Sequence, residues 1–154
     1  MRTIHRLVSA TALAAGLVCV TAAATLHGKD LGQDVNRQLA AARAATARYH
    51  DVNDAIADGY VPLGPNPAED NAFELVNFGL LDCTLDAAHP EALRYVESGD
   101  RLRLIAVEYA LPMACSSTPP EEFLPGVGEW EHEAGAPFWM IGVFVWSGAS
   151  SGAQ

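Results

Sequence analysis

Basic residues are scarce in this chain. Its 154 residues include nine Lys and Arg against nineteen Asp and Glu, which gives a formal net charge of −10 at pH 7. A surface of this sign repels phosphate backbones and anionic lipid headgroups, so we do not expect nucleic acid as a partner. The same charge favours solubility, and it suits cations as ligands.

The sequence also lacks the signature motifs of common enzyme classes. It contains no phosphate-binding loop, no dinucleotide fingerprint and no His-Glu-x-x-His zinc motif. The serines near the C-terminus form no nucleophile elbow, because no strand-to-helix turn is predicted there. These absences favour a non-catalytic domain that binds a small molecule or a protein. A metal-dependent enzyme is the alternative.

The N-terminal apolar stretch, residues 7–20, is shorter than the roughly 20 residues that a membrane-spanning helix needs. It follows Arg2 and Arg6 and precedes the small residues 22–24. A basic start, a short apolar core and small residues at the cut predict a signal peptide over residues 1–24. We therefore expect a secreted protein with no membrane span after cleavage.

Cys19 leaves a second interpretation of the leader open. A cysteine near the end of an apolar leader can carry a lipid, which would make the chain a lipid-anchored surface protein. Val18, directly before it, is branched where lipoprotein processing favours a small residue. Secretion is therefore the main expectation and lipid anchoring the alternative.

Cysteine is scarce as well, and two of the three residues lie beyond the leader: Cys83 and Cys115. An even pair in an exported chain predicts a disulfide. A thiolate metal site, the alternative, normally shows closer spacing and more ligands. The bridge would close a loop of about 33 residues.

The safest prediction of secondary structure is a long helix over residues 34–58. Apolar residues recur there every three or four positions, without Pro or Gly, which lays one apolar stripe along a helix. Asp34 offers an N-cap and Gly59 a stop. The preceding segment, residues 25–33, has little pattern and is expected to be a flexible arm.

The rest of the chain predicts a small antiparallel sheet. Runs rich in β-compatible residues are expected to be strands, at residues 73–81, 92–97, 101–111 and 139–146. Prolines and polar residues predict long loops over 60–71 and 112–130, and a disordered tail over 147–154. Without an alternating strand-helix pattern, the prediction is a single α+β domain over residues 34–146. Its long N-terminal helix would pack on one face of the sheet.

One carboxylate is singled out by the expected hairpin. If Ser98 and Gly99 form a two-residue turn, Leu93 faces Leu104 on an apolar face, and Glu108 falls on the same face. A carboxylate there needs an ionic partner, a proton or a bound cation. The alternative is that Glu108 lies at the end of the sheet and reaches water.

The densest group of potential metal ligands is the segment 129–133, in which His132 is flanked by glutamates. Carboxylates with an imidazole can bind Zn, Cu or Ni. Adjacent residues cannot all point at one ion unless the loop curls, however, and acidic loops also serve solubility. A divalent metal is therefore the cofactor to consider, without a complete ligand set.

Several phrases resemble a family of exported bacterial proteins of unknown function. They are Ala-Thr-Ala-Arg-Tyr-His-Asp over residues 45–51, Ala-Ile-Ala-Asp-Gly-Tyr-Val over 55–61, and Arg-Leu-Ile-Ala-Val-Glu-Tyr over 103–109. The resemblance covers most of residues 42–146. It implies an exported domain.

The resemblance also implies where a metal would bind. Members carry a Met-Gly-x-His phrase before the first strand and a His-x-x-x-His pattern in the last one, which together could hold a metal. In this chain Glu74, Phe138 and Gly142 stand at those histidine positions, and His132 remains. The surviving ligand set would be Glu74, Glu108 and His132, so we expect this member to bind metal weakly or not at all.

Overall fold

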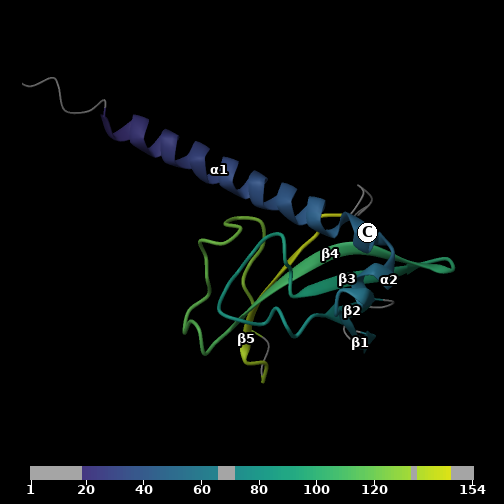
Figure 1. Ribbon diagram of the computed structural model, residues 1–154. Helices are drawn as coiled ribbons and strands as arrows, with labels where there is room; N and C mark the ends of the chain where they lie inside the picture. The colour runs from purple at the N-terminus through teal and green to yellow at the C-terminus, as the bar shows by residue number, and fades with distance from the viewer. Residues whose placement is uncertain (1–18, 66–71, 133–134, 147–154) are drawn as a thin grey trace, which may run out of the picture.

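A computed structural model describes residues 19–65, 72–132 and 135–146 (Figure 1). The predicted leader and C-terminal tail fall largely outside these ranges. Helical segments come first, namely α1 (Cys19–Thr46), the 3-10 turn η1 (Ala47–His50) and α2 (Val52–Ala57). Five strands follow: β1 (Val61–Pro65), β2 (Ala72–Val76), β3 (Ala92–Ser98), β4 (Arg101–Pro112) and β5 (Phe138–Val143).

The strands form one antiparallel sheet in the order β1-β2-β3-β4-β5, so each strand pairs with its neighbour in the sequence. Helical segments followed by an antiparallel sheet make this an α+β fold, as expected.

The helix predicted over residues 34–58 is interrupted at Thr46. The Thr46 hydroxyl is buried, donates to the Ala42 carbonyl at 2.7 Å and accepts the Trp146 Nε1–H at 3.0 Å. After η1, the Asp51 carboxylate accepts the backbone N–H of Asn53 at 3.0 Å and caps α2. The chain therefore turns where a straight helix was expected.

The start of the helix differs from the prediction as well. Asp34 lies inside α1 and does not cap it, and residues 25–33, expected to be a loose arm, are helical. The polar and Gly-containing composition of this segment shows no apolar periodicity from which a helix could be predicted.

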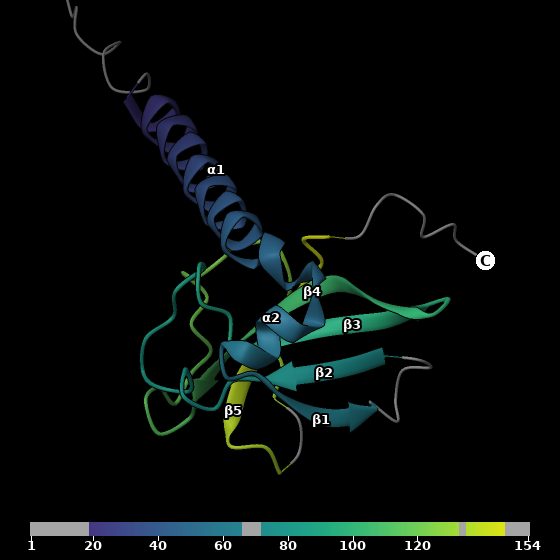
Figure 2. The same ribbon diagram turned by 45° about the vertical axis from the view of Figure 1, so that its right-hand side comes forward.

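The core face of the sheet is covered by the C-terminal end of α1, by η1 and by α2, and not by the whole of α1. Figures 1 and 2 show α1 extending away from the sheet, with its C-terminal turns against the rest of the domain. Among the described side chains of α1, Ala42 and Thr46 are buried and Leu39 is partly buried. The turn η1 and α2 then place Tyr49 and Ala55 against the core. The predicted apolar stripe thus contacts the core from Leu39 onward, but it does so from three successive short segments and not along one straight helix.

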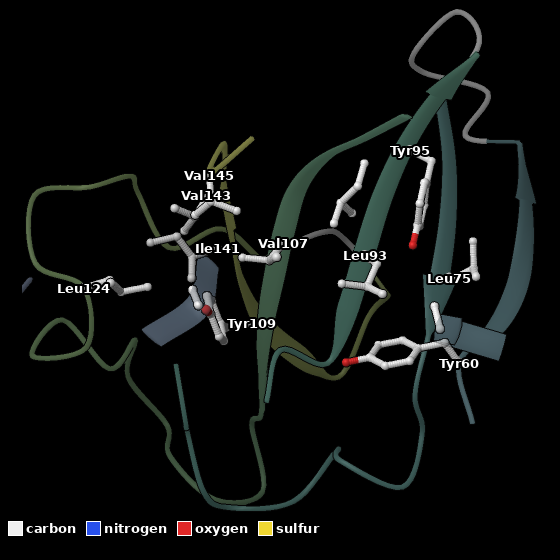
Figure 3. Close-up of a cluster of buried hydrophobic side chains, with 13 residues drawn as sticks. Tyr60, Leu75, Leu93, Tyr95, Val107, Tyr109, Leu124, Ile141, Val143 and Val145 are labelled. Atoms are coloured by element: carbon white, nitrogen blue, oxygen red, sulfur yellow. The ribbon is translucent and has the colours of Figure 1, made fainter. Parts of the chain in front are cut away.

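The core lies on one face of the sheet and has two lobes joined at Val107 (Figure 3). The first lobe surrounds Tyr95 and the second surrounds Tyr109. Each of these phenols donates to a backbone carbonyl, Tyr95 to Tyr49 at 2.6 Å and Tyr109 to Ala87 at 2.9 Å. Burial raises the pKa of both phenols, so they stay protonated and act as donors.

The β3–β4 hairpin turns one residue later than expected. Gly99 and Asp100 form the two-residue turn, with Ser98 paired to Arg101. Gly99 has φ +63°, and a glycine at the first central position is typical of a type II′ turn. The later turn pairs Tyr95 with Leu104, so the predicted pairing of Leu93 with Leu104 is wrong.

A β-bulge then changes the face on which Glu108 lies. Tyr95 pairs with Leu104 but Arg94 pairs with Ala106, so Ile105 is the extra residue of β4. Beyond the bulge the alternation of β4 is reversed, and Glu108 lies on the face opposite Leu93. The prediction that Glu108 shares the Leu93 face is therefore wrong.

Residues 60–71, expected to be a loop, include the edge strand β1. Its prolines, Pro62 and Pro65, are compatible with an edge position, because an edge strand can leave backbone donors out of the ladder. The neighbouring strand β2 ends at Val76, and residues 77–81 turn away, whereas a strand to 81 was expected. The strand β5 likewise ends at Val143.

Cys83 and Cys115 form the predicted disulfide, with 2.01 Å between the sulfurs and 5.4 Å between the Cα atoms. The bridge links the loop after β2 to the loop after β4. Within the described part of the chain, no helix offers an apolar stretch long enough to cross a bilayer.

Candidate functional site

Three charged side chains meet on the face of the sheet opposite the core. Glu74 on β2 pairs in register with Arg94 on β3, and Glu108 follows on β4. The Arg94 Nη2 atom lies 3.1 Å from Glu74 Oε1 and also contacts Glu108 Oε1. All three side chains are largely buried, with exposed fractions of 19% for Glu74, 16% for Arg94 and 4% for Glu108.

The residues around this ionic cluster are small. Gly142 on β5 pairs directly with Glu108, and a Cβ added at Gly142 would lie 3.9 Å from Glu108 Oε1. The other small neighbours on this face are buried alanines of the three central strands, Ala72, Ala92, Ala106 and Ala110. Their size leaves the long charged side chains to fill this face.

Arg94 supplies the partner that a buried Glu108 requires. Because Glu108 is almost fully buried, the alternative of a carboxylate reaching water at a sheet end is wrong. A guanidinium in contact with two carboxylates offsets much of the cost of burying them. A divalent cation bound by Glu74 and Glu108 would have to displace this guanidinium.

The third predicted metal ligand is not part of this cluster. His132 is exposed, its Nε2 lies 2.9 Å from the Ala136 carbonyl oxygen, and its ring lies 5.7 Å from that of Trp139. Over the described ranges of the chain, no three His, Cys, Asp or Glu side chains gather as a metal site would need. The structure thus brings Glu74 and Glu108 together, without His132.

The carboxyl group of Glu91 is also buried, and it was not predicted from the sequence. This residue is 2% exposed, and its Oε2 accepts the backbone N–H of Ala110 at 3.1 Å. Burial raises the pKa of Glu91 to about 7; the hydrogen bond from Ala110 opposes this shift, and the charges of Asp82 and Asp86 add to it. Glu91 therefore changes its charge near neutral pH.

A cavity of about 500 Å³ lies in the long loop between β4 and β5. Its walls include the half-buried rings of Phe123 and Trp130 and the apolar side chains of Leu124 and Pro125. Exposed Glu121 and Glu129 also line it. Its size lies within the range of pockets that hold small molecules. This segment was expected to be a loop, and no cavity was predicted there.

Contacts with distant parts of the chain hold the walls of the cavity in place. Leu124 is buried in a left-handed conformation with φ +51°, which costs a non-glycine residue roughly 1–2 kcal/mol. Its backbone N–H donates to the Gln38 side chain at 3.0 Å, which ties the loop to α1. The Phe123 ring packs edge-on against Tyr109 with 4.9 Å between centroids. The surrounding structure therefore fixes a strained residue at the cavity wall.

Gly128 brings the loop close to β5. A Cβ at this position would meet Ile141 Cγ1 at 3.3 Å, so a side chain there would require its neighbours to shift by a few tenths of an ångström. Next to it, Glu131 exchanges two backbone hydrogen bonds with Met140, at 2.7 and 2.9 Å. The loop is thus anchored to β5 directly beyond the cavity.

No protein-family model, curated protein or solved structure matches this chain. The ionic cluster on the sheet and the cavity in the loop are therefore interpreted from their own geometry and chemistry.

Proposed function

We propose that this protein is an exported domain that binds a small molecule or a protein without transforming it chemically. The observation that carries the proposal is the position of Arg94 between Glu74 and Glu108. Carboxylates held by a guanidinium within the sheet are poorly placed to act as general acid, general base or metal ligand. The cavity in the loop between β4 and β5 is then the site at which a ligand can bind.

Export is supported by two observations. Residues 1–24 have the basic start, apolar core and small residues of a signal peptide. The Cys83–Cys115 disulfide suits an oxidising compartment outside the cytoplasm. Cleavage after Ala24 would leave the mature chain starting within α1, at Thr25.

Mass spectrometry of the protein recovered from its native host tests the export proposal. A chain that begins at Thr25 supports secretion. A chain that begins at an acylated Cys19 supports the lipid-anchored alternative, and an intact Met1 contradicts both.

Membership of the exported bacterial family with the histidine-containing strands is part of the same proposal. Glu74 and Gly142, which stand at two of the family's histidine positions, lie on the same face as Glu108. Phe138 lies four residues before Gly142 on β5 and thus on that face too. This arrangement supports a shared site that in the present chain is occupied by Arg94.

Calorimetric titration with Zn²⁺ separates the binding domain from the metal-dependent enzyme. We expect no stoichiometric binding at micromolar concentration to the mature protein, because the ion would have to displace Arg94 from both carboxylates. Stoichiometric micromolar binding that is lost in the Glu108→Gln variant would contradict the proposal and favour the enzyme.

A further inference from the structure

We propose that the cavity lined by Phe123, Leu124 and Trp130 binds a small organic ammonium ion, with a quaternary amine as the model ligand. This inference rests on the proposed binding function and names the chemical class of the ligand. Its basis is the combination of aromatic walls, acidic rim and preformed shape in one cavity of about 500 Å³.

The aromatic walls suit a cation. The Phe123 and Trp130 rings lie 6.4 Å apart between centroids, with their planes at 57°, so they form two walls that meet at an angle. The Trp130 indole Nε1 is shielded from solvent, whereas the residue as a whole is half-buried, so its exposed surface is carbon. The face of an aromatic ring attracts an ammonium group, most strongly when the ring belongs to Trp.

The charges around the cavity select for the same ligand. Glu121 and Glu129 line it, and none of the described residues that line it is basic. An anion would be repelled by both carboxylates and by the overall charge of −10, whereas a cation is attracted.

The composition of the walls favours an organic cation over a metal ion. Metal ions are bound by several converging oxygen, nitrogen or sulfur ligands, and no such group of three forms in the described ranges of the chain. The apolar surface of Pro125 and of the two aromatic rings instead matches the methyl or methylene groups of an alkylammonium ion. The cavity is also much larger than a bare ion needs.

The site is held in its shape before any ligand binds. Leu124 is fixed by burial and by the hydrogen bond to Gln38, and Phe123 is fixed by its packing on Tyr109. A preformed site avoids the entropy cost of ordering a loop on binding, which favours even a small ligand.

Choline provides the test, with the neutral isostere 3,3-dimethyl-1-butanol as its matched control. Both are titrated into the mature protein and followed by amide NMR shifts, which also show whether each variant is folded. We expect saturable binding of choline with shifts in residues 121–130, and binding of the alcohol about tenfold or more weaker.

Variants assign the binding to the proposed walls. Trp130→Leu is expected to weaken choline binding about tenfold and Trp130→Phe much less, because Phe keeps an aromatic face. Glu129→Gln is expected to weaken it a few-fold, whereas Glu131→Gln, an exposed neighbour outside the cavity lining, leaves it unchanged.

Three results would overturn the inference. In the first, the alcohol and choline bind with equal affinity and both lose binding in Trp130→Leu. The cavity is then a binding site that does not select cations, so the proposed binding function stands and the proposed ligand class is wrong. Choline binding that is insensitive to Trp130→Leu refutes the site. No saturable binding of either compound refutes the site as well, and the export and zinc experiments then decide the proposed function independently.

Discussion

Arg94 compensates two carboxylates that lie inside the sheet, and its removal would leave both without that compensation. We predict that Arg94→Met lowers the free energy of unfolding by about 3–5 kcal/mol, the usual cost of breaking a buried ion pair from one side. Urea denaturation measures this. The exposed Arg103 on β4 provides the control, because Arg103→Met should change stability by less than about 0.5 kcal/mol.

The ion pair also predicts partial rescue. Adding Glu108→Gln to Arg94→Met removes a buried charge, so the double variant should be more stable than Arg94→Met alone. If instead the loss of unfolding free energy in the double variant equals the sum of the losses in the two single variants, Arg94 and Glu108 do not interact.

Glu91 should make stability depend on pH. Its pKa is about 7 in the folded protein and near 4.5 when unfolded, so the unfolded chain loses its proton first as pH rises. The contribution of Glu91 to stability is therefore greatest below about pH 4.5 and falls by about 3 kcal/mol towards pH 7. Glu91→Gln keeps an acceptor for the Ala110 N–H and should abolish this part of the decline.

The measurement is the difference in unfolding free energy between variant and wild type, from about pH 4.5 to about pH 7.5. For Glu91→Gln we expect the variant to gain about 3 kcal/mol of unfolding free energy relative to wild type as the pH rises over this range. The exposed Glu97 on β3 gives the control variant Glu97→Gln, which should show no such gain. Parallel curves for Glu91→Gln and wild type would contradict the assignment.

At the scale of elements, the hairpin shows why strands were easier to predict than their pairing. The runs that form β3 and β4 were identified within a few residues, because their composition alone favours strands. The register depended on whether the turn begins at Ser98 or Gly99, and on the extra residue Ile105. A bulge leaves almost no mark in composition, so Arg94 could not be identified as the partner of Glu108.

The helical segment shows a second limit of sequence patterns. The apolar stripe continues through Thr46 without interruption, because the residues of η1 and α2 that contact the core keep the same spacing. At the break, the buried Thr46 hydroxyl accepts a hydrogen bond from Trp146, one hundred residues away in the sequence. A contact between residues so far apart cannot be predicted from the spacing of apolar residues within one segment.

The turn of the hairpin gives a prediction at this scale. Gly99 has φ +63°, and no atom of the described residues lies within 4 Å of the position that a Cβ would take. Gly99→Ala therefore introduces backbone strain without a clash, and we expect a loss of about 1–2 kcal/mol in chemical denaturation. Asp100→Ala, at the exposed second position of the turn, should stay within about 0.5 kcal/mol of wild type.

At the scale of the whole molecule, the Cys83–Cys115 disulfide joins the two long loops that flank the sheet. The sequence separation of 32 residues corresponds to a contribution of about 3–4 kcal/mol through the unfolded state. Replacing both cysteines by serine should lower the unfolding free energy by about that amount. Reduction of the wild-type protein should match the double variant, and a much smaller effect would contradict this role of the bridge.

The fold class could be predicted from the order of helical and strand patterns, and the disulfide from an even pair of cysteines beyond the predicted leader. The cavity could not, because its walls come from residues whose roles depend on tertiary contacts. Leu124 is held in its conformation by Gln38, and Phe123 is oriented by Tyr109. Neither contact joins residues that are close in the sequence.

The prolines of β1 bear on how molecules of this protein behave towards one another. Pro62 and Pro65 have no N–H group, so the outer edge of the sheet presents an incomplete row of donors to any strand from a neighbouring molecule. Lateral growth of the sheet into fibrils is thereby hindered at this edge. Two residues that at first indicated only a loop thus protect this edge against association with other copies of the chain.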